Sequence, residues 1–148
     1  MSASPNPLLG KVSQSSTRYA HATTTLSQTI VEVEAFLNTL PGKREVSITR
    51  SGEATEDGLS FTRAGGGTWQ INYVPPPLAQ LVLIASTRRG NGTAPLRDLP
   101  VEMKLKAAPL LAPLIQKLAD ELCAEALRAE NAVAAVRAAL EPLRKGGA

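Results

Sequence analysis

The sequence predicts an α+β fold: an antiparallel meander of about four strands, flanked by two long helices that pair lengthwise, plus one short helix. Two observations predict this class. Near both ends of the chain, apolar residues recur at steps of three and four, a spacing typical of helices packed side by side. Between them, from Arg44 to Ala85, apolar and polar residues alternate, as they do in strands with one buried face.

The first long helix is predicted from Ser13, a suitable N-cap, to Leu40, because Pro41 and Gly42 then stop it. Residues 1–12 are predicted to form a flexible leader, and residues 13–145 a single domain. We call the stripe of residues expected to face another helix the seam. The seam of the first helix consists of Tyr19, Thr23, Leu26, Ile30, Val33, Leu37 and Leu40.

Four apolar segments predict the sheet. They contain Val46 and Ile48; Leu59 and Phe61; Trp69, Ile71 and Tyr73; and the run from Leu78 to Ala85. Glycine-containing connections separate the first three segments and predict tight antiparallel turns. Trp69 alternates with Ile71 and Tyr73, so we expect it to be largely buried between the sheet and a helix.

The short helix is predicted over residues 99–108, capped by Asp98, although alternation around Met103 leaves a fifth strand as the competitor. Pro109 and Pro113 predict a kink or a new start, followed by the last long helix up to about Leu143. We expect antiparallel pairing of the two long helices with the sheet at one end, within one chain or between chains. The seam of the last helix consists of Leu111, Ile115, Leu118, Leu122, Ala126, Ala129, Val133, Val136, Leu140 and Leu143.

Composition excludes several classes of site. Aromatic residues make up 3% of the chain, too few for a sugar-binding cleft or a base-stacking surface. The net charge of +3 is lower than expected for a dedicated nucleic-acid-binding protein, which has a dense cluster of Lys and Arg residues. The lone Cys123 cannot form an internal disulfide, which favours the cytoplasm, and no apolar run is long enough to predict a membrane span.

No catalytic, cofactor or metal site is predicted. His21 is the only histidine, and no serine lies in a nucleophile-elbow motif. A zinc site needs more Cys or His side chains than the chain has. The first helix carries an unusual face of uncharged hydroxyls, and its candidate interface residues are Ser15, Thr17, Thr24 and Ser27. A candidate patch for anions or nucleic acid consists of Arg88, Arg89, Lys104 and Lys106.

These features favour a non-enzymatic interaction or assembly protein, whose paired helices bind a second copy or another protein. An accessory nucleic-acid binder with a basic loop is the alternative, and an enzyme without a recognisable motif is third. The order helix, strands, helix is similar to prefoldin, in which two coiled-coil arms leave a small β-structured body, at the level of architecture alone.

Overall fold

The computed structural model describes residues 7–77 and 93–146. It confirms the predicted class, an antiparallel four-stranded sheet with two long helices. The elements follow one another in the order α1 (Pro7–Asn38), β1 (Val46–Thr49), β2 (Gly58–Arg63), β3 (Trp69–Val74), β4 (Ala94–Pro95) and α3 (Val101–Gly146). Two 3-10 turns, Gly65–Gly67 and Leu96–Asp98, connect β2 to β3 and precede α3.

The sheet has the order β1-β2-β3-β4, with antiparallel neighbours throughout. Val46 pairs with Phe61 and Phe61 pairs with Ile71, so these buried side chains lie on the same face, as the alternation predicts. Gly58 pairs with Thr49, and a Cβ atom at Gly58 would lie 1.8 Å from the backbone oxygen of Ile48. Only glycine therefore fits this position without moving β1.

The fourth strand differs from the predicted one. The predicted segment, Leu78 to Ala85, lies outside the described residues, and the observed β4 is the two-residue strand Ala94–Pro95, which pairs with Asn72 and Tyr73. Two residues are too few to show a period in the sequence. Pro95 suits an edge strand because it has no N–H group to donate.

The prediction of a separate short helix was wrong, because residues 101–108 are the first turns of one continuous helix, α3. They are helical, which also excludes the competing strand. Pro109 and Pro113 do not interrupt α3, and both lie on its exposed face. The opposite face holds the helix against the sheet through Ala107, Leu110, Leu114 and Leu118, all buried.

Helix α1 begins at Pro7, six residues before the predicted start at Ser13. A proline in the first turn is compatible with a helix because the N–H group it lacks has no partner there. Residues 7–12 of the predicted leader are therefore helical in the structure, and residues 1–6 lie outside the described part. After α1, Gly42 adopts a φ angle of 72°, which lets the chain turn toward the sheet.

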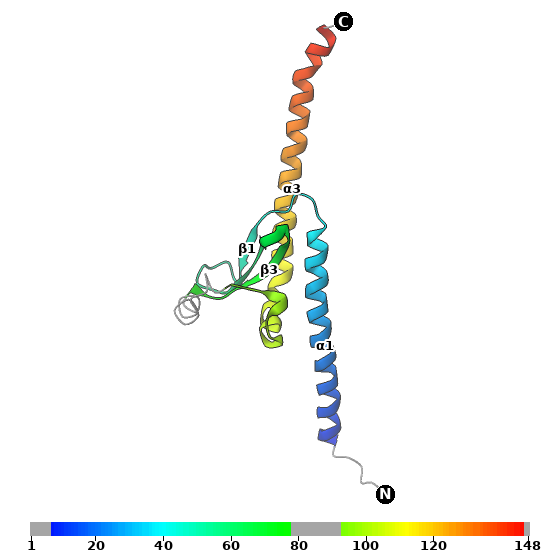
Figure 1. Ribbon diagram of the computed structural model, residues 1–148, viewed down its shortest axis with the longest axis vertical. Coiled ribbons are helices and arrows are strands. Elements are labelled where there is room, and N and C mark those ends of the chain that lie inside the picture. Colours follow the sequence, from blue (N-terminus) through cyan, green and yellow to red (C-terminus); the bar gives the residue numbers. More distant parts are fainter. Residues whose placement is uncertain (1–6, 78–92, 147–148) are drawn as a thin grey trace.

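The two long helices run parallel and are staggered, so the predicted antiparallel direction was wrong. Lys104 contacts Ser27, and farther along α3 the side chain of Leu122 lies beside Gly42, in the turn that follows α1. Figure 1 shows that α1 ends near the middle of α3. Between the two helices the strands return the chain to α1, where Arg97 pairs with Glu34 just before α3 begins.

The core lies where the last turns of α1, the first turns of α3 and one face of the sheet meet. Helix α3 contacts β1 and β2, whereas α1 contacts β3 and the turn before α3. Trp69 lies on the predicted face and stacks on Phe61 with ring centroids 5.2 Å apart, but it is half-buried instead of largely buried. Among the hydrophobic residues of the described core, those with no exposed surface are Ile30, Leu59, Phe61, Ile71, Leu96 and Ala107.

Candidate protein–protein interface

Both long helices continue well past the core. We call residues 7–22 of α1 the N-terminal arm and residues 126–146 of α3 the C-terminal arm, and every residue in both arms is exposed. Figure 1 shows the arms projecting in opposite directions from the region where the sheet lies. They are the most extended surfaces that the described part of the chain offers to another molecule.

The apolar seams extend along these arms. The seam of α1 is buried or half-buried from Thr23 to Leu40, whereas Tyr19, in the arm, is 55% exposed. The seam of α3 is at least half-buried as far as Leu122, and from there its apolar members are exposed. In the C-terminal arm these are Val133, Val136, Leu140 and Leu143, between 47% and 70% exposed. The stagger leaves one of the seven predicted seam residues of α1, Tyr19, and six of the ten of α3 exposed.

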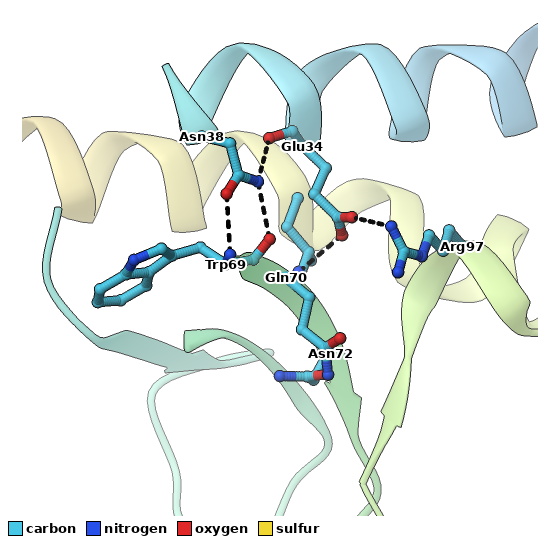
Figure 2. Close-up of polar contacts among 7 residues, drawn as sticks. Glu34, Asn38, Trp69, Gln70, Asn72 and Arg97 are labelled. Atoms are coloured by element: carbon cyan, nitrogen blue, oxygen red, sulfur yellow. Dashed lines mark hydrogen bonds and ion pairs between the residues drawn. The ribbon is translucent and has the colours of Figure 1, made fainter. Parts of the chain in front are cut away.

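Side chains of α1 fix its position by closing the edge of β3. Glu34 accepts a hydrogen bond from the backbone N–H of Ile71 at 2.9 Å and pairs with Arg97 at 2.8 Å. One turn later, Asn38 accepts from the backbone N–H of Trp69 and donates to its carbonyl, both at 2.8 Å. Figure 2 shows both α1 side chains reaching toward this strand. The contacts set where α1 lies along β3, and with it the length of the N-terminal arm.

A second polar cluster joins the sheet to α3. Arg50 donates two hydrogen bonds to Asp57, at 2.9 and 2.8 Å, and a third to the carbonyl of Lys106. The hydroxyl of Tyr73 donates to the same carboxylate at 2.8 Å. The Arg50 hydrogen bond holds the pKa of Asp57 at about 2, and burial together with Asp57 raises the pKa of Tyr73 to about 12. Both groups keep one protonation state near neutral pH, which suits a structural cluster.

Neither cluster was identified from the sequence. Their carboxylates, those of Glu34 and Asp57, are both buried. The only available signal was the spacing of Glu34 and Asn38, four residues apart beside the seam. This spacing places two polar side chains on one helix face but does not say what they contact.

The predicted interface residues fall into two groups. Ser15, Thr17 and Thr24 are exposed, the first two in the N-terminal arm. The hydroxyl of Thr17 donates to the carbonyl of Ser13 in its own helix, so this donor is satisfied without a partner molecule. Ser27 is half-buried and accepts a hydrogen bond from Lys104 at 3.2 Å. The contact that it makes is therefore within the chain.

The described part of the chain does not assemble the predicted basic patch. Arg88 and Arg89 lie outside the described residues, and the Lys104 side chain is directed between the helices while Lys106 is exposed. Lys104 and Ser27 also have the composition of an activated serine nucleophile. However, neither Ser27 nor Lys104 lines the hollows found on the two arms or the hollow beside β1 at Pro113.

The single histidine, His21, and the single cysteine, Cys123, are both exposed on helices. Within residues 7–77 and 93–146, no three His, Cys, Asp or Glu side chains gather as metal ligands would. No helix in these ranges is long and apolar enough to cross a bilayer. In comparisons with known protein families, curated proteins and solved structures, the chain matches none of them.

Proposed function

We propose that the protein is a non-enzymatic assembly protein whose helical arms bind a second copy of the chain or another protein. The observation that carries the proposal is the continuation of both apolar seams beyond the contact between α1 and α3. Val133, Val136, Leu140 and Leu143 follow one stripe and remain exposed. A contiguous apolar stripe on an exposed helix is typical of an interaction surface.

The stability of the arms supports the same proposal. Most helical stability in proteins comes from packing an apolar face against another element. The C-terminal arm extends from residue 126 to residue 146 with no packing against the described remainder of the chain. A partner helix that buried each exposed Val or Leu would contribute roughly 1.5–3 kcal/mol per side chain.

The N-terminal arm contributes a surface of different chemistry. Val12 and Tyr19 line a shallow hollow together with Lys11 and the hydroxyls of Ser15 and Ser16. The arm carries two positive side chains, Lys11 and Arg18, and no acidic residue. Without acidic side chains it has little to repel an acidic or uncharged helix, which favours contact with another chain.

Light scattering at several protein concentrations tests the proposal. For wild type we expect a measured mass above that of the monomer. The variant Val133→Glu with Leu140→Glu should have a lower measured mass, because assembly would have to bury its two added charges at the seam. The control is Ala138→Glu, which adds a negative charge on the opposite face of the same arm. Circular dichroism at each concentration shows whether the arm stays helical.

Two results would contradict the proposal. One is a strict monomer at tens of micromolar that also brings down no defined protein when purified from its source. The other is an association that the seam variant leaves unchanged. Nucleic acid that co-purifies with the protein would favour the alternative hypothesis, a nucleic-acid binder with a basic loop. The described residues do not bring the predicted basic side chains together in a patch. As part of the same proposal we place the protein in the cytoplasm, where its free Cys123 would stay reduced.

A further inference from the structure

We infer that two copies of the chain pair through their C-terminal arms in antiparallel orientation, with the two-fold axis midway between Ala134 and Ala135. The inference rests on the proposed assembly function and deepens it by naming the partner, the direction and the register. Three independent features of the arm point to this arrangement: the sizes of its seam residues, its unpaired charges and the position of the core.

Side-chain size along the seam is the first feature. The seam residues of the arm are Ala126, Ala129, Val133, Val136, Leu140 and Leu143, at alternating steps of three and four. This is the heptad spacing in which one helix inserts its seam between the seam residues of another. The small residues come first and the large residues last, with two valines of equal size in the middle.

Antiparallel pairing about the proposed axis places a small residue opposite each large one. Ala126 faces the partner's Leu143, Ala129 faces the partner's Leu140, and Val133 faces the partner's Val136. Every layer of the interface then contains a similar side-chain volume, which lets two straight helices pack at a constant separation. Parallel pairing would place Ala126 opposite the partner's Ala126 and Leu143 opposite the partner's Leu143, so the helices would be too far apart at one end.

Charge is the second feature. Glu130 and Arg137 flank the seam, and neither forms an ion pair with another residue in the described ranges, whereas Arg128 pairs with Glu125 and Lys145 with Glu141. Hollows beside the seam are lined by Glu130, Val133 and Arg137, so these charges border the proposed contact. In the antiparallel register, Glu130 lies next to the partner's Arg137, and the two-fold axis repeats this attractive pair.

The position of the core is the third feature. Helix α1 and the sheet pack along α3 as far as Leu122, and Arg44 from the following loop reaches Glu125 at 3.4 Å. In the proposed register, residues 123–146 of one copy overlap the same residues of the other. Residue 123 of one copy then lies opposite residue 146 of the other, so the core of each copy lies past the C-terminal end of the other copy's α3. The exposed arms can therefore overlap without a collision between the two cores.

Charge reversal tests the register. Glu130→Arg alone and Arg137→Glu alone each convert two attractive pairs into two repulsive pairs, so we expect the dimer dissociation constant to rise about tenfold. The double variant should restore the wild-type constant. An equimolar mixture of the two single variants should form a heterodimer as tight as wild type. Ala138→Arg, which adds positive charge on the opposite face, is the control.

Disulfide trapping tests the direction in a Cys123→Ser background. A mixture of Ala126→Cys and Leu143→Cys chains should form a cross-linked heterodimer. Neither variant should cross-link to itself, because residues 126 of the two copies would be about 25 Å apart at about 1.5 Å per residue, far beyond disulfide reach.

Self-linking of Ala126→Cys would show parallel pairing and overturn the inference. So would charge reversals that leave the dissociation constant unchanged in a protein that does associate, and in that case the proposed assembly function would still stand. If wild type stays monomeric and seam substitutions have no effect on any association, the assembly function itself fails.

Discussion

Glu34 is the residue whose replacement most directly tests how α1 is held against the sheet. Glu34→Ala removes the acceptor of the buried Ile71 N–H and the partner of Arg97. A buried donor without an acceptor costs about 1–3 kcal/mol. The ion pair adds only about 0.5–1 kcal/mol, because the Arg97 side chain is 47% exposed and can be rehydrated. We therefore expect the free energy of unfolding to fall by about 2–3 kcal/mol.

Two further variants separate these contributions. Glu34→Gln keeps an oxygen acceptor for Ile71 but removes the charge, and it should cost about 1 kcal/mol. Glu32→Ala, which replaces an exposed carboxylate on the same helix, should change stability by less than about 0.5 kcal/mol. Urea unfolding at one fixed protein concentration, followed by circular dichroism, gives the three values.

Trp69 fluorescence provides a local reading of the same change, because its backbone pairs with Asn38 one turn after Glu34. Loosening of α1 should expose the half-buried indole further and shift its emission to longer wavelength. The reasoning would be refuted if Glu34→Ala matched Glu32→Ala in stability and left the emission unchanged. The contacts seen in Figure 2 would then contribute nothing measurable to the position of α1.

Three further predictions concern the sheet. Because the pKa of Asp57 is lowered from 3.8 to about 2, it stabilises the fold by about 2 kcal/mol above pH 3.8, and this is lost as pH falls toward 2. The stability difference between wild type and Asp57→Asn should shrink over that interval in urea titrations. The pKa of Tyr73 is raised from 10.0 to about 12, so its contribution is full below pH 10 and disappears as pH rises through 12. Tyrosinate absorbance of wild type minus that of Tyr73→Phe should show this late ionisation, and a difference spectrum that rises at pH 10 would exclude the Asp57 contact. Gly58→Ala should cost about 3 kcal/mol or more, because its Cβ would lie 1.8 Å from a backbone oxygen that cannot move without unpairing β1. Gly65→Ala, with no atom within 4 Å of the added Cβ, is the control, and equal melting temperatures for the two variants would contradict the register of β1 and β2.

The periodicity of the sequence was enough to predict the fold class. Apolar residues spaced three and four apart predicted both long helices. The alternation of apolar and polar residues predicted β1, β2 and β3 with the correct buried face. These predictions succeed because a periodic pattern records which side of an element is buried, and that side depends on local backbone geometry. The same pattern placed the seams on the arms, since an apolar stripe is visible in the sequence whether or not something covers it.

Direction, stagger and the polar clusters depend on the tertiary structure. An apolar stripe faces a partner equally well in either orientation, so the seams of α1 and α3 could not distinguish parallel from antiparallel pairing. In the folded chain the strands return to α1 at the Arg97–Glu34 ion pair, and α3 then runs in the same direction as α1, from the contact of Lys104 with Ser27 to that of Leu122 with Gly42. The same holds for Asp57 and Lys104, which a local pattern places on the surface as charged residues. In the folded chain Asp57 accepts from Arg50, which also donates to the carbonyl of Lys106 in α3, and Lys104 donates to Ser27 on α1, 77 residues away in the sequence.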